Sequence, residues 1–341
     1  MTKKLIVGSV PVGGGTPVTI QSMCNTKTDQ VDATVAQIHA LEAAGCEIIR
    51  IAVPDEAAAM AVDQITIPLI ADIHFNYKLA IMCAERGIDA LRINPGNIGG
   101  EERVKAVAEA CRRKRIPIRI GVNGGSLEKS LRAKYGGVTA EALVESAMGH
   151  VKLLNRYDFD DICISVKCSD VPLTMRSYTL LSQQTDYPLH LGVTEAGTPA
   201  MGMIKSAMGI GGLLCMGIGD TMRVTLTADP VEEVYAAQRI LRAAGLRRDG
   251  VNLIACPTCG RTRIDLIPMA EEVERRLAGC KKNITVAVMG CAVNGPGEAS
   301  AADVGIAGGD GEGLIFRKGE ILYKVPQEQL VDALMKEIEK L

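Results

Sequence analysis

The sequence predicts an α/β protein with an N-terminal (β/α)8 barrel of the TIM type and a small C-terminal α/β domain. Short apolar runs alternate with helix-like segments from residue 18 to about residue 226, the pattern of repeated βα units. Eight such units can be counted, and eight close a parallel barrel. A polar break follows Leu246, and the sequence after it is organised differently. We therefore expect a barrel over residues 1–246 and a second domain over residues 247–341.

The eight expected strands are short and apolar, and each precedes a segment that can form a helix. They cover residues 18–23, 47–53, 68–73, 89–93, 117–122, 160–166, 188–193 and 221–226. Helical spacing is clear in two sets, Val31, Val35, Ile38 and Leu41, and Leu143, Ala147, Val151 and Leu154. A doubly wound open sheet is the alternative architecture, and the count of eight units favours the barrel.

Composition narrows the class of protein. Hydrophobic residues make up 47% of the 341 residues but aromatic residues only 3%, a palette that suits parallel sheets covered by helices. The net charge of −2 provides no field that would hold nucleic acid or an acidic membrane. We find no export signal and no apolar run of membrane-spanning length. Eleven cysteines then fit a reducing compartment, so we expect a cytoplasmic protein with no membrane or nucleic-acid partner.

The C-terminal segment predicts a small α/β domain built around cysteines. We expect a strand over 251–255, a cysteine turn, a helix over 262–277, a strand over 284–289, a Gly-Pro loop and a final helix near 327–340. Cys256 and Cys259 follow the first strand and are expected beside the positive start of the helix, which favours thiolates. Cys291 leaves the second strand in a glycine-rich loop, whose N–H groups can approach sulfur.

Three thiolates in one small domain predict a metal centre. Zinc in a closed structural site normally takes four protein ligands, and Cys280 could supply a fourth sulfur. Cys280 follows a helix end away from the two cysteine turns, so we count three thiolates. An iron-sulfur cluster held by three sulfurs leaves one iron open or bound by a weaker oxygen ligand, and Glu298 lies on the loop of Cys291.

Polar residues interrupt the apolar pattern near the strand ends of the barrel. They are Arg50, Asp72, His74, Arg92, Asn94, Arg119, Asn123, Lys167, Glu195 and Arg223. In a barrel, the C-terminal strand ends form the active site. Five cations against two carboxylates would repel one another unless a polyanion compensates, and arginine forks match phosphate oxygens. The pattern predicts a phosphate or diphosphate site.

The remaining histidines and glycines predict little further chemistry. His74 could ligate a metal, transfer a proton or donate to phosphate. His39 and His150 fall within helix patterns and are expected on solvated faces, while His190 is expected to be a satisfied barrel residue. No glycine pair completes a dinucleotide-binding fingerprint.

The motifs together are similar to one family, the bacterial two-domain 4-hydroxy-3-methylbut-2-enyl diphosphate synthases of the methylerythritol phosphate route to isoprenoids. The resemblance spans the chain and rests on VTIQSM (18–23), ADIHF (71–75), LRINPGN (91–97), IRIGVN (118–123), SVK (165–167), GVTEAG (192–197), CPTCGR (256–261) and GCAVNGPGE (290–298). Thr225 is a departure, because the family motif has serine there, but the hydroxyl is kept.

The resemblance implies an iron-sulfur oxidoreductase that reductively opens 2-C-methyl-D-erythritol 2,4-cyclodiphosphate by two one-electron transfers through a 4Fe-4S cluster. It implies cluster ligation by Cys256, Cys259, Cys291 and Glu298, and catalytic roles for Glu195, Asp72 and Asn123. It also implies a substrate cradle of Arg50, His74, Arg92, Arg119, Lys167, Arg223 and Thr225. Flavodoxin or ferredoxin as electron donor and a homodimer, in which the cluster domain caps the partner's barrel, are implied likewise.

Two rival classes remain open from the residues alone. One is a phosphate-binding barrel lyase with a structural zinc module, and the other is a non-catalytic metal-binding interaction protein. Visible absorption distinguishes an iron-sulfur protein from a zinc protein, because zinc has a filled d shell and gives no absorption band in the visible range.

Overall fold

The computed structural model describes residues 1–62, 68–292, 297 and 299–341, which form two compact units, Met1–Leu246 and Arg247–Leu341. The division falls at the polar break after Leu246. None of the helices in the described ranges combines the length and the apolar character that a bilayer crossing requires. The two units are described separately below.

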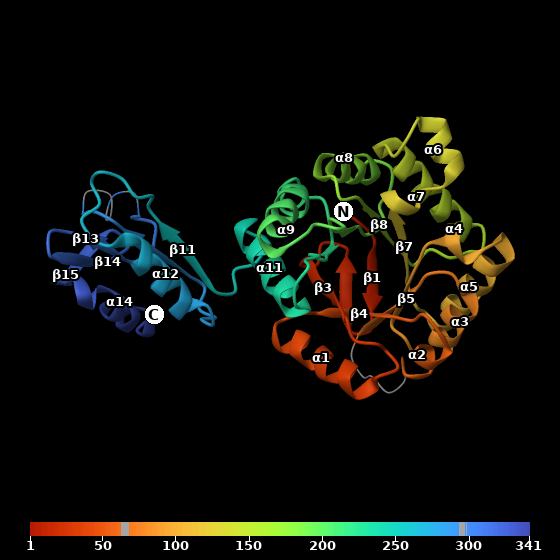
Figure 1. The fold of residues 1–341 in the computed structure, drawn as a ribbon, viewed down its shortest axis with the longest axis horizontal. Helices are drawn as coiled ribbons and strands as arrows, with labels where there is room; N and C mark the ends of the chain where they lie inside the picture. The colour runs from red at the N-terminus through yellow and green to blue at the C-terminus, as the bar shows by residue number, and fades with distance from the viewer. Residues whose placement is uncertain (63–67, 293–296, 298) are drawn as a thin grey trace. The chain divides into compact units, whose positions relative to one another are not determined.

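The first unit is an eight-stranded parallel barrel, which confirms the expected fold class (Figure 1). Its sheet runs in the order β8-β7-β6-β5-β4-β3-β10-β9, and a bridge between Ile164 and Leu189 brings the two ends of the sheet together. All eight strands fall within the expected runs except for the last residues of β7 and β8: β3 (Thr19–Met23), β4 (Ile48–Ala52), β5 (Leu69–Ile73), β6 (Ala90–Ile93), β7 (Ile118–Asn123), β8 (Ile162–Lys167), β9 (His190–Leu191) and β10 (Thr221–Met222).

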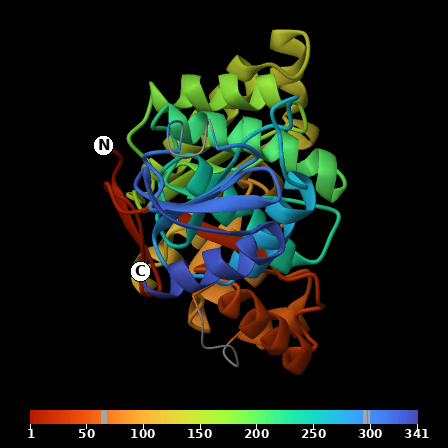
Figure 2. The same ribbon diagram turned by 90° about the vertical axis from the view of Figure 1, so that its left-hand side faces the viewer.

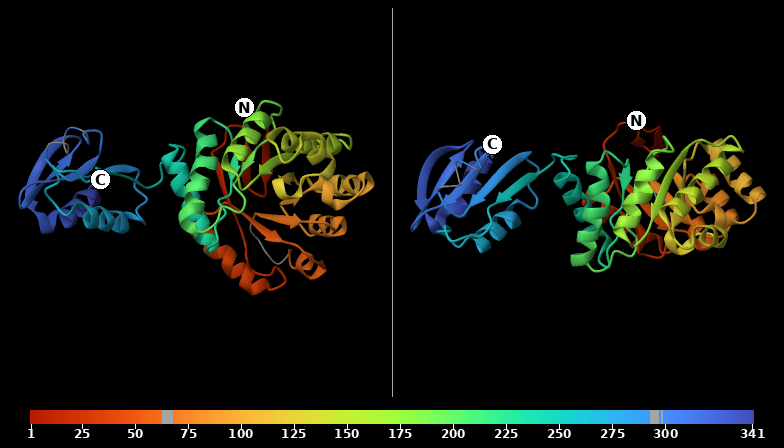
Figure 3. Two further views of the ribbon diagram at one scale, coloured as in Figure 1. Left: turned by 45° about the horizontal axis from the view of Figure 1, so that its top comes forward. Right: turned by 90° about the horizontal axis from the view of Figure 1, so that it is seen from above.

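Helices surround this sheet, as Figure 3 shows from two further directions. The described helices of the first unit are α1 (Val31–Ala43), α2 (Glu56–Met60), α3 (Tyr77–Glu85), α4 (Pro95–Ile98), α5 (Glu101–Lys114), α6 (Lys129–Tyr135), α7 (Ala140–Asn155), α8 (Val171–Ser182), α9 (Pro199–Ser206), α10 (Gly212–Cys215) and α11 (Pro230–Ala243). Short turns of other helix types cover 124–126 and 207–211. The main apolar core lies between these helices and the outward-facing residues of the strands.

A hairpin that the sequence analysis did not predict closes the bottom of the barrel. It pairs β1 (Lys4–Val7) with β2 (Val10–Gly13). Its Val7 and Val12 pack against Ile48, Ile70 and Ala90, which lie at the N-terminal ends of β4, β5 and β6. This end of the barrel is therefore sealed by apolar contacts, and the polar residues are left to the opposite end.

The second unit is a five-stranded mixed sheet with two helices on one face (Figures 2 and 3). Its strands are β11 (Val251–Ala255), β12 (Ile284–Met289), β13 (Val304–Gly308), β14 (Glu312–Arg317) and β15 (Glu320–Pro326). The helices are α12 (Leu266–Leu277) and α14 (Leu330–Glu339), the latter after a short turn at Gln327–Gln329. The last three strands were not expected from the sequence. The expected start of the first helix at residue 262 was wrong, because α12 begins four residues later.

Candidate active site

Strand alternation directs polar side chains into the barrel. Ile49 and Ile51 on β4 belong to the core between strands and helices, so Arg50 between them points inward. Asp72 lies in the same way between buried Ala71 and Ile73 on β5. The same alternation applies on the next strands to Arg92, Arg119 and Lys167, which are 8%, 4% and 9% exposed. A polar interior is thus fixed by the sequence pattern of the strands.

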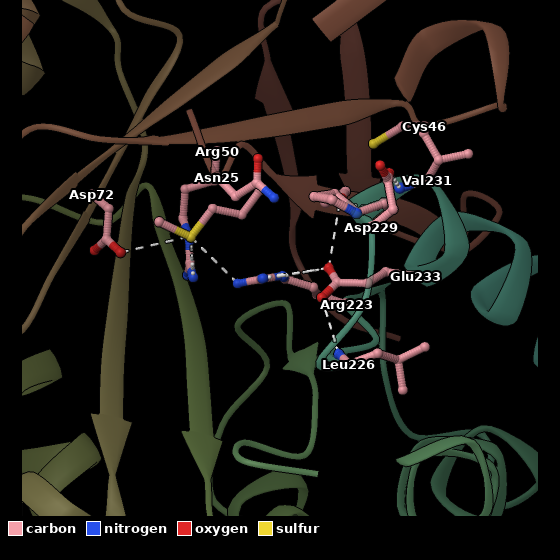
Figure 4. Close-up of polar contacts among 12 residues, drawn as sticks. Asn25, Cys46, Arg50, Asp72, Arg223, Leu226, Asp229, Val231 and Glu233 are labelled. Atoms are coloured by element: carbon pink, nitrogen blue, oxygen red, sulfur yellow. Dashed lines mark hydrogen bonds and ion pairs between the residues drawn. The ribbon is translucent and has the colours of Figure 1, made fainter. Parts of the chain in front are cut away.

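Asp72 is a buried carboxylate of this interior, and Figure 4 shows its contact with Arg50. Its two oxygens lie 3.6 Å from Nε of Arg50 and 3.2 Å from Nη1 of Arg92. Burial opposes ionisation of Asp72, but the charges of Arg50 and Arg92 outweigh it and lower the pKa of this carboxyl. Asp72 is therefore an ionised partner for two buried guanidinium groups.

Arg92 is held in one orientation from three sides. Besides Asp72, its Nη2 donates to the carbonyl oxygen of Gly121 at 3.2 Å. The Asn123 amide, oriented so that both of its ends are satisfied, accepts from the same nitrogen at 3.3 Å. A Cβ atom on Gly121 would lie 2.3 Å from Nε of Arg92, so only glycine leaves room for this side chain. Arg92 and Asn123 were predicted from the sequence as site residues, whereas Gly121 was not.

Lys167 is the last residue of β8, and its side chain is buried in the barrel. In the parts of the chain that the structure describes, its ammonium group has no carboxylate partner and no hydrogen bond. Burial lowers the pKa of Lys167 well below its ordinary value, and the charges of Arg119 and Arg50 lower it further. A Cβ atom on Gly192 would lie 2.5 Å from Nζ, so this glycine also makes space for a cation. An anion at the mouth would relieve both the desolvation and the repulsion.

Arg119 lies deeper in the barrel. It donates through Nη1 to Oε1 of Gln21. Its Nε and Nη2 have no hydrogen-bond partner among the described residues, although both are buried. Burial lowers the pKa of Arg119 to about 10. These two guanidinium nitrogens are donors available to a ligand, since buried donors in native proteins are normally paired.

Arg223 follows β10 and meets a carboxylate that the sequence analysis did not identify (Figure 4). Both Nε and Nη2 of Arg223 lie 3.4 Å from Oε2 of Glu233 on α11. That helix begins where Asp229 accepts the N–H of Val231 at 2.9 Å and Pro230 takes the first helical position. Glu232 is exposed and Glu233 is buried, but both stand in the run PVEEV (230–234), in which no sequence pattern distinguishes one glutamate from the other.

Three expected site residues lie at the rim instead of inside. His74 is exposed directly after β5, and its charge contributes to lowering the pKa of Asp72, after the larger effects of burial, Arg50 and Arg92. Glu195 is exposed in the loop after β9 with a φ of 53°, and its carboxylate has no hydrogen bond or ion pair within the described ranges. Thr225 is half-buried between β10 and α11. Asn94 instead caps α4, accepting from the N–H of Gly96 at 3.1 Å.

The expectation that His150 lies on a solvated face was wrong. His150 is 9% exposed on the buried stripe of α7, and its Nε2 lies 3.0 Å from Oε1 of Glu128. Ser146 donates to the same oxygen at 2.9 Å. The close approach of the His150 imidazole is the main cause that lowers the pKa of Glu128 to about 2. His150 lies seven residues after Leu143 and four before Leu154, so helical spacing itself places it on the apolar face, and the expectation gave too much weight to its polarity.

The cysteine turns of the second unit lie at one edge of its sheet. β11 and β12 are parallel neighbours, so Cys256 and Cys291 both leave the same edge. Sγ of Cys256 accepts the N–H of Gly290 at 3.0 Å. Cys259 is exposed, and a hydrogen bond from the backbone of Arg261 is the main cause that lowers the pKa of its thiol. The thiolate preference thus comes from the turn itself, since α12 starts too late to supply a helix end.

No three side chains of histidine, cysteine, aspartate or glutamate among the described residues are close enough together to hold a metal ion. Glu298 lies outside the described residues. Cys280 follows α12, which returns from the cysteine edge, and therefore lies toward the opposite end of the sheet. The donors Cys256, Cys259 and Cys291 still suit iron and sulfide chemically, because thiols are soft ligands, and N–H groups are directed at the sulfurs of Cys256 and Cys259.

Comparison with known proteins gives matches over both units. Residues 2–238 match the model of the GcpE TIM-barrel domain, and residues 252–340 match that of the GcpE protein C-terminal domain. The chain is 60% identical over 344 residues to the 4-hydroxy-3-methylbut-2-en-1-yl diphosphate synthase (flavodoxin) of Geobacter sulfurreducens, covering 100% of this chain and 98% of the relative. It is 60% identical over 342 residues to the protein of the same name from Clostridium perfringens, covering 99% and 98%.

Among solved structures, the barrel is similar to the dihydropteroate synthase of Stenotrophomonas maltophilia. The TM-score is 0.51 at 13% identity, over 72% of this chain and 98% of the other. At this identity the likeness concerns the fold alone.

Proposed function

Because the chain belongs to the GcpE family, we propose that it catalyses the reaction for which its relatives are named, the synthesis of 4-hydroxy-3-methylbut-2-en-1-yl diphosphate with flavodoxin as electron donor. It is an oxidoreductase. The substrate is 2-C-methyl-D-erythritol 2,4-cyclodiphosphate. Two electrons and two protons open its ring at a C–O bond and release one hydroxyl as water. The alternative of a barrel lyase with a structural zinc module is not favoured by these relatives.

The observation that carries the proposal is the surplus of buried positive charge in the barrel. Asp72 compensates Arg50 and Arg92, but Lys167 and two guanidinium nitrogens of Arg119 have no partner among the described residues. A diphosphate supplies several acceptor oxygens and the missing negative charge, so it fits these donors better than a neutral sugar would.

Within this cradle, each residue has a defined task. Arg50, Arg92, Arg119, Lys167 and Arg223 bind the diphosphate, and His74 and Thr225 at the rim add hydrogen bonds. Asp72 and Asn123 face the carbon skeleton and keep Arg92 in place. Exposed Glu195 is the proton-transfer residue, because its carboxylate is free to reach a substrate hydroxyl.

Cys256, Cys259 and Cys291 hold a 4Fe-4S cluster in this proposal, with Glu298 as an oxygen ligand. The cluster supplies single electrons received from flavodoxin. The protein acts as a homodimer in which the second unit of one copy covers the barrel mouth of its partner, so that reducing centre and substrate meet.

The experiment is anaerobic reconstitution of the full chain with iron and sulfide, followed by turnover of the cyclic diphosphate with reduced flavodoxin. We expect about four irons per chain, a broad visible absorption and the allylic diphosphate as product. A colourless zinc-containing protein without turnover would overturn the proposal.

A further inference from the structure

Glu233 is a buried carboxylate that contacts Arg223, a residue of the substrate cradle, from the helix outside the barrel wall. It lies on α11, outside the barrel wall, and is 4% exposed. Its Oε2 is 3.4 Å from Nε and Nη2 of Arg223 and 3.4 Å from Oγ of Ser22 on β3. Its Oε1 accepts the backbone N–H of Leu226 at 3.0 Å. Four donor atoms thus converge on this buried carboxylate and hold it in one place.

The contact with Leu226 extends the influence of Glu233 to the neighbouring loop. Residues 223–226 span from Arg223 past Thr225 to Leu226, so both ends of this short segment are bound to one carboxylate. The next N–H, of Thr227, donates to the carbonyl oxygen of Gly197 at 2.9 Å. Gly197 lies two residues after Glu195. The segment therefore also supports the loop that carries the proton-transfer residue.

Charge balance explains why a carboxylate is needed at this position. Asp72 compensates the charges of Arg50 and Arg92. Arg223 instead has the uncharged sulfur of Met23 on its inner side, 3.4 Å from Nη1. Arg223 is one of the cations whose charge lowers the pKa of Lys167. Without Glu233, repulsion from the other cations would drive the Arg223 side chain away from the mouth.

We propose that Glu233 is a positioning residue for diphosphate recognition: it holds the Arg223 guanidinium toward the barrel mouth and fixes the 223–226 segment. This inference rests on the proposed function only in that the barrel binds a diphosphate. Glu233 itself does not touch the substrate.

The test is a double-mutant cycle on the full chain, with inorganic pyrophosphate as the probe and isothermal calorimetry as the readout. Glu233→Gln replaces an acceptor oxygen with an N–H₂ group that faces the donors of Arg223. We expect the dissociation constant to rise about tenfold in the Glu233→Gln variant. In an Arg223→Ala background the same substitution should change it by less than about twofold. The matched control is Glu232→Gln, an exposed neighbour on α11, which should bind as wild type does.

Equal weakening by Glu233→Gln in both backgrounds would overturn the inference, because a merely structural role does not depend on Arg223. If Glu233→Gln does not fold, Glu233→Asp keeps the charge but shortens the reach. It should weaken binding at least about threefold with Arg223 present and not without it. Absence of pyrophosphate binding by the wild-type chain would instead refute the diphosphate cradle, and the inference with it.

Discussion

The barrel interior and the cysteine edge of the second unit are both candidate sites, but they are built to different degrees. In the barrel, Asp72, Arg92 and Lys167 are each at most 9% exposed. Asp72 and Arg92 form an ion pair, and Gly121 and Gly192 leave the space that the side chains of Arg92 and Lys167 occupy. In the second unit, Cys291 is buried, Cys256 is half-buried and Cys259 is exposed. No three metal-binding groups are gathered there among the described residues.

This difference teaches how each kind of site forms. Side chains on neighbouring parallel strands converge because the strand pattern alternates, so the fold alone assembles the cradle. Thiols on turns have no attraction for one another, and a metal supplies the energy that gathers them. In the proposed function, the diphosphate site is therefore preformed, while the sulfur site is completed by iron.

The largest expected effect is the complete loss of metal binding in the second unit. Replacing Cys256, Cys259 or Cys291 by serine should abolish iron incorporation and turnover, because serine is a much poorer iron ligand than thiolate. Cys280→Ser is the matched control, since this residue lies at the other end of the sheet, and it should keep full iron content. Iron and sulfide analysis of anaerobic preparations decides the matter. Equal iron loss in Cys280→Ser would mean that Cys280 is a fourth cysteine ligand of the metal.

In the barrel, the largest effect is expected from a single methyl group. In Gly121→Ala the new Cβ would lie 2.3 Å from Nε of Arg92 and displace it, so pyrophosphate affinity should fall on the order of 100-fold. Gly125→Ala is the control, because nothing lies within 4 Å of its added Cβ. Calorimetry on both variants measures the effect. Unchanged affinity in Gly121→Ala would show that Arg92 does not need its observed position.

A milder change of the same side chain should cost less. Arg92→Lys keeps the charge but loses the fork that spans Asp72 and Gly121, so binding of the cyclic diphosphate should weaken by about 1 to 3 kcal/mol. Arg113→Lys, an exposed ion pair with Glu85, should have almost no effect. Steady-state kinetics provide the readout. An unchanged Michaelis constant together with unchanged turnover would remove Arg92 from the cradle.

The smallest effect concerns the stability of the ligand-free protein. The folded-state pKa of Lys167 is lowered below the ordinary 10.5, so at neutral pH the unfolded chain holds this proton more readily than the folded chain does. Lys167→Met should therefore raise the free energy of unfolding by on the order of 1 kcal/mol at pH 7. The gain should shrink as the pH rises toward 10.5, where the wild-type lysine becomes neutral in both states.

Denaturant unfolding at pH 7 and at pH 9 measures this difference. Lys152→Met, at an exposed position of α7, is the control and should change stability little. Destabilisation by Lys167→Met at both pH values would mean that the ammonium group has a stabilising partner.

The sequence could predict the barrel and most of its charged interior, because alternation is a local property. Arg50, Asp72, Arg92 and Lys167 were predicted together, since each interrupts an aliphatic strand at an inward position. Glu233 could not be predicted, because its contacts with Arg223 and with Ser22 on β3 are set by tertiary packing. Gly121 was missed because the need for glycine there depends on the path of the Arg92 side chain.

Non-local pairing explains the other gaps. The β1–β2 hairpin is held by apolar contacts with strands that come much later in the chain. β13 is the third of three parallel strands, and β14 and β15 are added to it as antiparallel strands. Glycines in β13 and β14 weaken the apolar pattern there, and the exposed residues of β15 give it no apolar face. The start of α12 was misplaced because the residues after Cys259 form a turn, in which the N–H of Thr262 donates to the carbonyl oxygen of Cys259 at 3.0 Å.

The most direct test of the preformed cradle is pyrophosphate binding to the full chain before and after iron-sulfur reconstitution. Calorimetry on the metal-free protein should give a dissociation constant within about threefold of that of the reconstituted protein, because the binding residues are fixed by the barrel alone. Turnover of the cyclic diphosphate should appear only after reconstitution. Pyrophosphate binding that requires the metal would contradict the account, because the cradle would then depend on the second region for its assembly.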